Sequence, residues 1–167
     1  QALVDSGFGS SLIWKKEPTA VDYSSVFYFN VIISLFLYIV FFLLAPVIAN
    51  FYNEPQLVNL IRVICLNFII LSLSLIQQVV LQKKVEFKLL TFVNVAGSII
   101  GGVIALILAY RGFGAWSIVF QILVKSFITS LLLWIFNKWR PLLAFSWLSL
   151  KELFSYGSKL TVAGLIY

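Results

Sequence analysis

Residues 115–136 form one continuous apolar stretch, AWSIVFQILVKSFITSLLLWIF, which contains a single charged residue, Lys125, near its middle. About 20 helical residues span the roughly 30 Å hydrocarbon core of a bilayer, so this stretch is long enough to cross a membrane. A lysine at that depth is costly in lipid and should face protein or water. The stretch also contains four polar residues at four-residue steps: Ser117, Gln121, Lys125 and Thr129. That spacing predicts a membrane-spanning helix with one polar side.

Two interpretations of Lys125 remain open from the sequence. Its side chain can extend toward the lipid headgroups or pair with another helix, which would make it structural. Alternatively, the polar side of the helix lines a cavity, and the ammonium group receives an anionic cargo there.

The rest of the chain is also apolar, with 62% hydrophobic and 11% charged residues over 167 positions. Such a composition is unlike that of a soluble domain. We therefore expect an all-α fold, a polytopic transmembrane helix bundle with complete spans at residues 26–51, 57–81, 89–110 and 115–136. Residues 1–14 are expected to end an earlier span and residues 153–167 to begin a further one. Because the sequence also lacks methionine, we interpret it as a fragment of a single transmembrane domain.

The sequence offers no pattern typical of a metal site or an enzyme. It has no histidine, and Cys65 is the one cysteine, so metal clusters, disulfides and Cys/His catalysis are unsupported. Neither a nucleophile–base pair nor paired carboxylates on one helix side are found. We expect no catalytic residue, no metal, no cofactor and no enzymatic activity. The net charge of +6 comes from basic residues between the spans, so we expect no nucleic-acid partner.

The span expected at residues 57–81 has a second polar side. Asn67, Ser74 and Gln78 are spaced by seven and four residues, which superimposes them on one side of a helix. Arg62 lies close enough to the end of this span to reach the headgroups. The amides can line a cavity, or they can form hydrogen bonds between helices.

The span expected at residues 89–110 contains two pairs of small residues four positions apart: Gly97 with Gly101, and Ser98 with Gly102. Such pairs allow a second helix to approach closely, so helix packing is the preferred interpretation. Asn94 lies on the same side as Ser98, and this surface could instead border a cavity.

Pro46 lies near the far end of the first expected span. Proline removes a backbone donor and clashes with the preceding turn, so we expect a kink or break at residues 42–46. Such breaks serve as hinges in some transporters and are also common in inert membrane helices.

Basic residues alternate between the loops. They occur in the first, third and fifth loops, as Lys15, Lys16, Lys83, Lys84, Lys88, Lys138, Arg140 and Lys151. The second loop has none and the fourth has Arg111. Because positive charge marks the cytoplasmic side, we predict that the loops at residues 15–16, 83–88 and 138–151 are cytoplasmic.

Several segments, taken in order and spacing, resemble a known family. They are DSGFGSSLIWKK, SSVFYFNV, LLAPVIANFYNEP, LVNLIRVICLNF with LIQQVVLQKKVEFK, and RPLLAFSWLSLKELFSYGSKL. They resemble the Wzx-like flippases of bacterial inner membranes, which move lipid-linked oligosaccharides of the O-antigen and colanic-acid type. These proteins belong to the multidrug/oligosaccharidyl-lipid/polysaccharide exporter (MOP) superfamily. The resemblance implies a MATE/MOP-like fold of two six-helix lobes around a central cavity, with this chain as most of the amino-terminal lobe.

What the resemblance implies is transport of an undecaprenyl-pyrophosphate-linked oligosaccharide by alternating access, for assembly of O-antigen, capsule or exopolysaccharide. It also implies membrane lipids, a polysaccharide polymerase and a chain-length regulator as partners. A diphosphate and sugar head needs a hydrated cationic cavity, so Lys125 is the candidate to meet phosphate. Four amides are candidates to bind sugar hydroxyls: Gln121, Gln78, Asn67 and Asn94. Arg62 matches a position where relatives tend to be basic, whereas Thr129 stands where relatives often carry arginine.

Two other functions remain open. A cation-coupled multidrug or toxin exporter of the same superfamily usually needs an intramembrane carboxylate, and the six acids here lie in loops or near span ends. A membrane scaffold of a glycan-assembly complex, with no transport of its own, would explain the small-residue packing surfaces. It gives no reason for a lysine in the middle of a span.

Overall fold

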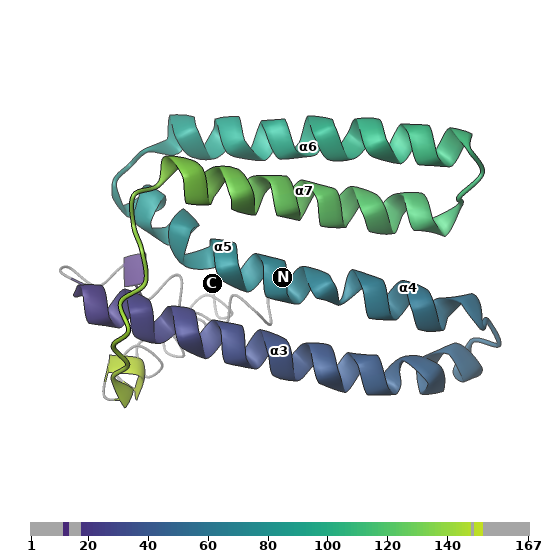
Figure 1. Ribbon diagram of the computed structural model, residues 1–167, viewed down its shortest axis with the longest axis horizontal. Coiled ribbons are helices and arrows are strands. Elements are labelled where there is room, and N and C mark those ends of the chain that lie inside the picture. Colours follow the sequence, from purple (N-terminus) through teal and green to yellow (C-terminus); the bar gives the residue numbers. More distant parts are fainter. Residues whose placement is uncertain (1–11, 14–17, 148, 152–167) are drawn as a thin grey trace, which may run out of the picture.

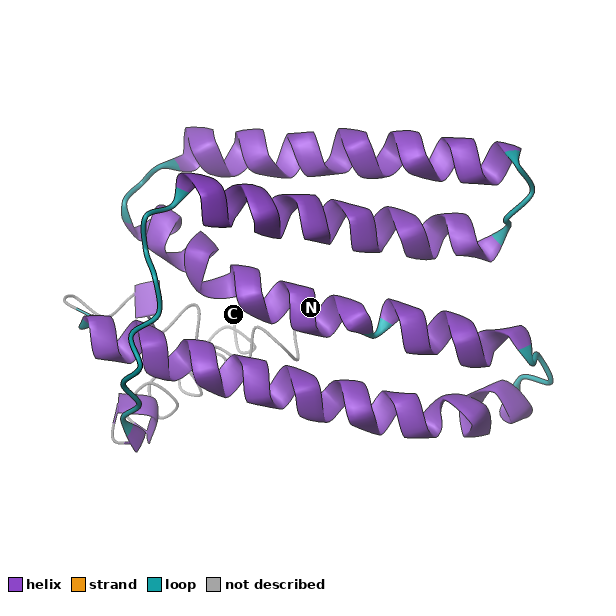
Figure 2. Ribbon diagram, in the orientation of Figure 1, coloured by secondary structure: helices purple, strands orange, loops and turns teal. Residues whose placement is uncertain are grey.

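The computed structural model describes residues 12–13, 18–147 and 149–151, and all structural statements below concern these residues. Its long helices are α3 (Ala20–Phe51), α4 (Gln56–Ile64), α5 (Leu66–Lys83), α6 (Phe87–Tyr110) and α7 (Ala115–Phe136). The described residues contain no strand (Figure 2). Four segments are long and apolar enough to cross a membrane, with α4 and α5 forming one of them. The predicted all-α bundle of a multi-pass membrane protein is confirmed.

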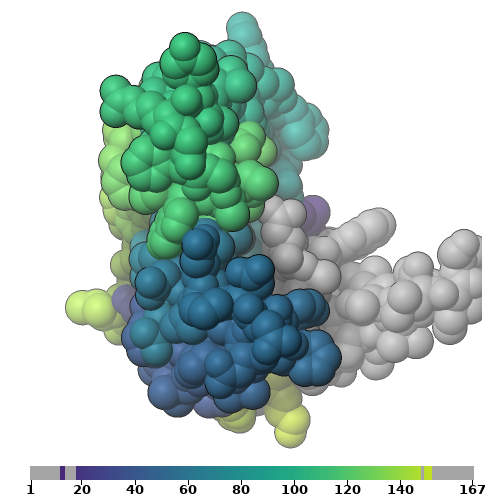
Figure 3. Space-filling view, turned by 90° about the vertical axis from the view of Figure 1, so that its right-hand side faces the viewer, coloured from purple at the N-terminus to yellow at the C-terminus, as the bar shows by residue number. Residues whose placement is uncertain are grey.

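The helices form two antiparallel hairpins that lie against each other (Figure 1). In the first, α3 runs beside α4 and α5; in the second, α6 runs beside α7. The line of α4 and α5 lies between α3 and α7. The turns at residues 52–55 and 111–114 lie at one end of the bundle, and the turn at residues 84–86 lies at the other. Figure 3 looks onto the first of these ends and shows α6 and α7 stacked on α3 and α4.

The first described span begins earlier than the apolar pattern predicted, at Ala20 rather than at residue 26. Its start is set by a capping box. The Thr19 hydroxyl accepts a hydrogen bond from the Asp22 backbone N–H (3.2 Å), and the Asp22 carboxylate accepts one from the Thr19 N–H (2.9 Å). This pair satisfies two backbone donors that a helix start leaves free. The start of α3 is indicated in the sequence by the three-residue spacing of Thr19 and Asp22, which a hydropathy pattern does not detect.

No break occurs at residues 42–46, because α3 continues through Pro46 to Phe51; the kink expected there stays a prediction. Proline removes one hydrogen bond of the helix, and a single loss is tolerated in a membrane-spanning helix. The interruption lies instead at Cys65, between α4 and α5, where the sequence analysis expected one helix from 57 to 81. The Phe68 N–H bonds to the Cys65 carbonyl (3.0 Å), a three-residue step that tightens the backbone.

Buried apolar side chains concentrate in two clusters. One joins α3 to α5 and includes Val26, Phe27, Ile76 and Val79. The other joins α5, α6 and α7 through Leu81, Leu90, Val93 and Leu133. Both lie toward the end of the bundle at which α5 turns into α6, so this end carries most of the core.

The expected partial spans at residues 1–14 and 153–167 lie outside the described residues, apart from residues 12–13.

Candidate functional site

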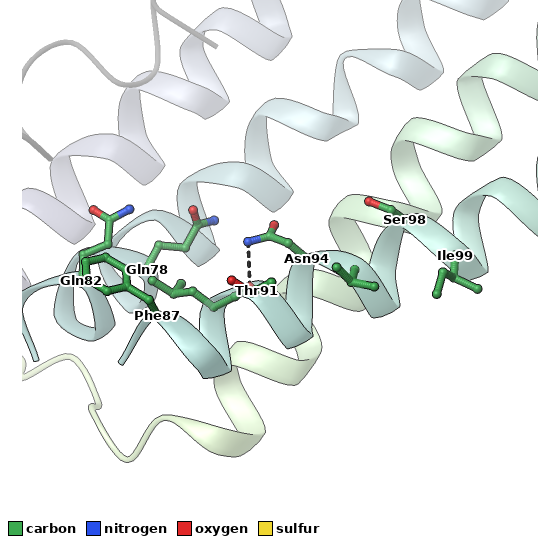
Figure 4. Close-up of a pocket in the computed structure, with 9 residues that line it drawn as sticks. Gln78, Gln82, Phe87, Thr91, Asn94, Ser98 and Ile99 are labelled. Atoms are coloured by element: carbon green, nitrogen blue, oxygen red, sulfur yellow. Dashed lines mark hydrogen bonds between the residues drawn. The ribbon is translucent and has the colours of Figure 1, made fainter. Parts of the chain in front are cut away.

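A groove of about 540 Å³ lies between α5 and α6 (Figure 4). We call it the amide groove. Its lining residues are Gln78, Gln82, Phe87, Leu90, Thr91, Asn94, Val95, Ser98 and Ile99. Three carboxamides and two hydroxyls therefore face one space, together with an aromatic ring and aliphatic side chains.

The polar groups of the amide groove are neutral and can both donate and accept hydrogen bonds. The Asn94 amide nitrogen donates to the Leu90 carbonyl (2.9 Å), and that of Gln78 donates to the Ser74 hydroxyl (3.4 Å). In Figure 4 the amide groups of Gln78 and Asn94 point toward one another. Amides, hydroxyls and an aromatic ring suit a ligand that carries many hydroxyl groups.

The amide groove extends far along the helix axis. Phe87 is the first residue of α6, and Ile99 lies twelve positions further on. At 1.5 Å per residue this separation is about 18 Å. The groove therefore begins at the end of the bundle that carries the turn at residues 84–86 and reaches the middle of α6.

Lys125 lies near the middle of α7, about 15 Å from either end of the helix. A Cβ atom built on Gly101 would lie 3.2 Å from the Cβ of Lys125, so the stem of the lysine starts at the contact with α6. The side chain is exposed. Within the part of the chain that the structure describes, it forms no hydrogen bond or ion pair.

The four residues of the polar side predicted for α7 differ in their burial. Ser117 and Thr129 are buried, whereas Gln121 and Lys125 are exposed. Gln121 and Lys125 are not among the residues that line the amide groove. A ligand that bound both surfaces would therefore contact two separate places on the described bundle.

The two other predicted residues, Arg62 and Asn67, lie on either side of the interruption at Cys65. The Arg62 guanidinium carbon lies 4.2 Å from the centre of the Phe42 ring, a cation–π contact between α4 and α3. Its Nε atom and the Asn67 side-chain oxygen are buried, and neither has a hydrogen-bond partner within the described part of the chain. Of the six predicted site residues, the structure brings only Gln78 and Asn94 together in one groove.

The sequence analysis missed a buried network around Gln77, which is fully buried. Its amide nitrogen donates to the Trp139 carbonyl (3.3 Å), and its backbone carbonyl accepts a bond from the Asn137 side chain (3.2 Å). The Asn137 oxygen accepts a bond from the Trp139 N–H (3.2 Å). The Trp134 indole N–H donates to the Leu73 carbonyl (3.1 Å). These bonds join α5 to the end of α7 and the segment that follows it.

Arg140 closes the end of α7. Its guanidinium donates to the carbonyls of Trp134 (3.0 Å), Asn137 (2.8 Å) and Trp139 (2.8 Å). Carbonyls in the last turn of a helix have no partner within the helix, and a cation there is stabilising. The role of Arg140 is therefore structural. Among the described residues, no group of three histidine, cysteine, aspartate or glutamate side chains could hold a metal ion.

Comparison with known proteins gives a match to the family described as "Polysaccharide biosynthesis protein" over residues 1–167. The chain is 29% identical to the teichuronic acid biosynthesis protein TuaB of Bacillus subtilis, over 95% of this chain and 33% of the relative. It is 26% identical to the lipopolysaccharide biosynthesis protein WzxC of Escherichia coli, over 98% of this chain and 34% of the relative.

A further relative is the succinoglycan biosynthesis transport protein ExoT of Rhizobium meliloti, which is 26% identical over 84% of this chain and 28% of its own length. The chain thus spans about a third of the length of the curated relatives it matches. No solved structure matches the chain.

Proposed function

The chain belongs to the polysaccharide biosynthesis protein family, and on that premise we propose that it is part of a flippase. The cargo is a lipid-linked oligosaccharide, with undecaprenyl pyrophosphate as its carrier. The protein moves it from the cytoplasmic to the periplasmic leaflet of the bacterial inner membrane by alternating access, for assembly of O-antigen, capsule or exopolysaccharide. The names of three relatives support this proposal, because they refer to the biosynthesis of teichuronic acid, lipopolysaccharide and succinoglycan, and the third also refers to transport.

The observation that carries the proposal is the position of Lys125. Lys125 lies about 15 Å from either end of α7, so in a helix that crosses the bilayer its side chain would start near the middle, where lipid is a costly environment for an ammonium group. It is exposed on the described bundle and forms no ion pair within it. A diphosphate that crosses the membrane needs a cation at this depth. We assign Lys125 to the phosphate groups, with Gln121 one turn away to bind sugar hydroxyls.

The amide groove supplies the second part of the proposal. Gln78 and Asn94 lie in it and bind hydroxyls of the sugar unit. Arg62 and Asn67 have buried polar atoms that lack partners in the described structure, and a cargo or other parts of the full-length protein would satisfy them. Unpaired buried polar groups are costly, which supports a role for both residues.

The orientation of the bundle follows from its charges. The described cations at the end where α5 turns into α6 and where α7 ends include Lys83, Lys84, Lys88, Lys138 and Arg140. The opposite end has Arg111 in its turn. We place the lysine-rich end in the cytoplasm. The predicted loop at residues 15–16 lies outside the described residues.

A cation-coupled drug exporter is the weaker candidate. The acids that the structure describes are Asp22, Glu54 and Glu86. Asp22 caps the start of α3, and the other two lie in turns at the bundle ends, so none supplies a carboxylate at mid-membrane depth. We also assign no catalysis to this chain. The polymerase and the chain-length regulator of the same assembly process are its proposed protein partners.

The proposal is tested by replacing Lys125 in the full-length protein. Lys125→Ala should abolish surface polysaccharide while the amount of protein in the membrane stays unchanged, and Lys125→Arg should retain part of it. Lys84→Ala, which removes an exposed lysine of the turn between α5 and α6, is the matched control and should leave polysaccharide unaltered. Normal polysaccharide in the Lys125→Ala strain would end the assignment of this residue to the cargo.

A further inference from the structure

Two grooves of different chemistry run along neighbouring sides of α6. The amide groove faces α5. The second, which we call the outer groove, has a volume of about 580 Å³. It is lined by Lys88, Thr91, Phe92, Val95, Ala96 and Ile99. Apart from Lys88 and Thr91 at one end, its lining is apolar.

The two grooves share one wall. Thr91, Val95 and Ile99 line both of them. Residues four apart stand above one another on a helix, so these three form a low ridge between a polar space and an apolar space. A molecule with a polar part and an apolar part could occupy both grooves at once by crossing the ridge.

Lys88 gives the outer groove a charged end. It is the second residue of α6, it is exposed, and within the described residues it has no hydrogen bond or ion pair. The first N–H groups of a helix also favour an anion. Glu86 precedes the helix but lines neither groove. An ammonium group at the head of an apolar groove matches the phosphate of a lipid above its tail.

The length of the outer groove matches one leaflet. Lys88 and Ile99 are eleven positions apart, which corresponds to about 17 Å of helix. Half of a roughly 30 Å hydrocarbon core is close to this length. A lipid whose phosphate meets Lys88 would therefore lay its tail along the groove in the orientation that it already has in the cytoplasmic leaflet.

We propose, building on the flippase function above, that α6 is the portal at which the lipid-linked sugar docks from the cytoplasmic leaflet. The isoprenoid tail lies in the outer groove, the phosphate groups meet Lys88, and the sugar crosses the ridge at Thr91 into the amide groove. An ordinary phospholipid has too small a hydroxyl-bearing head to fill the amide groove. A sugar on a lipid diphosphate fits both spaces.

The test uses the full-length protein in nanodiscs of phosphatidylethanolamine and phosphatidylglycerol. The probe is a polyprenyl diphosphate that carries N-acetylglucosamine, and its retention is measured by native mass spectrometry. Lys88→Ala removes the ammonium group, and Ala96→Trp fills the outer groove. Each should weaken retention about tenfold, which corresponds to the loss of one charge-assisted contact or a comparable steric block.

Two matched variants control for charge and bulk. Lys84→Ala removes a neighbouring exposed lysine, and Val103→Trp adds the same ring on an exposed part of α6 beyond the groove; both should retain the probe like the unaltered protein. Unchanged retention in Lys88→Ala and Ala96→Trp would overturn the portal. So would loss of bound phosphatidylglycerol without loss of the probe, which would make the groove a general lipid site.

A third measurement tests whether the outer groove is open in the whole protein. A cysteine at position 96 should react with a membrane-soluble thiol reagent, and a failure to react would show that the rest of the protein covers this side of α6. Failure of the portal leaves the flippase proposal intact, because that proposal is tested separately by the polysaccharide phenotype of Lys125→Ala.

Discussion

The helix α7 makes two contacts that differ in kind. Near its middle it packs closely on α6: a Cβ atom on Gly97 would lie 2.5 Å from the Thr129 hydroxyl oxygen, and one on Gly101 would lie 2.9 Å from the Gln121 carbonyl oxygen. At its end it meets α5 through large side chains and hydrogen bonds from Asn137 and Trp134. The contact with α6 therefore depends on the absence of side chains at Gly97 and Gly101. The contact with α5 depends on hydrogen bonds.

The glycine contact bears on function because it fixes α6 against α7 at the level of Lys125. The Cβ atom of Lys125 lies at the glycine contact, so the backbone that carries this lysine is fixed against α6. On its α5 side, α6 leaves the amide groove open. The α6–α7 pair thus carries Lys125 on α7 and the amide groove on the α5 side of α6, as two separate surfaces of one packed helix pair.

The largest effect should come from adding volume at the glycine contact. In Gly97→Ala the new methyl group would also lie 3.0 Å from the Lys125 backbone carbonyl, which cannot move aside as a side chain can. The two helices must separate, and we expect the free energy of unfolding to fall by about 3 kcal/mol. Denaturant unfolding of the purified full-length protein in detergent measures this change.

Gly102→Ala is the matched control for that substitution. A Cβ atom there has no neighbour within 4 Å, so the same added methyl group should leave the stability unchanged or slightly raised by its helix propensity. If Gly97→Ala and Gly102→Ala lowered the free energy of unfolding equally, α6 would not pack on α7 through Gly97. The contrast between the two contacts of α7 would then fail.

A smaller loss should follow from removing a partner at the end of α7. Asn137 is buried and bonds to both Gln77 and Trp139. Asn137→Ala removes both of these hydrogen bonds and leaves the Trp139 N–H without its partner, so we expect the free energy of unfolding to fall by about 2 kcal/mol. The exposed neighbour Lys138 provides the control, since Lys138→Ala should have no measurable effect. If both variants unfold alike, the network around Gln77 does not stabilise the bundle.

The smallest effect should come from Trp134→Phe. This change keeps an aromatic ring against Phe27 but removes the indole N–H that bonds to the Leu73 carbonyl. A single hydrogen bond contributes about 1 kcal/mol, and the unfolding free energy should fall by that amount. Trp116→Phe, at the opposite end of α7, should not change it. A larger loss for Trp116 than for Trp134 would contradict the assignment of this contact.

The glycine contact between α6 and α7 could be predicted from the sequence, whereas the hydrogen-bonded contact between α7 and α5 could not. Glycines four positions apart indicate close packing on their own, and of the two predicted pairs the Gly97–Gly101 pair meets α7. Gln77 and Asn137 are 60 positions apart, and nothing local to either residue indicates its partner. The family, by contrast, was predicted from several segments together and is confirmed by the match over residues 1–167.

The same reasoning explains the errors in helix limits. Apolar composition located α7 at residues 115–136, because the apolar stretch begins and ends where the helix does. It missed the start of α3, which hydrogen bonds of Thr19 and Asp22 determine. The break considered at Pro46 does not occur, whereas an unexpected one lies at Cys65, where neither glycine nor proline marks the site. Of the six residues predicted to line one cavity, the structure groups only Gln78 and Asn94, which lie on helices that turn into each other.

The most direct measurement is leaflet transfer by the reconstituted full-length protein. Liposomes would carry a lipid-linked sugar in one leaflet, and a membrane-impermeant enzyme or lectin would report its arrival in the other. We predict rapid transfer with the unaltered protein, and transfer no faster than in protein-free liposomes with Lys125→Ala. Transfer by Lys125→Ala at the unaltered rate, or none by the unaltered protein, would contradict a flippase in which this lysine meets the phosphate of the cargo.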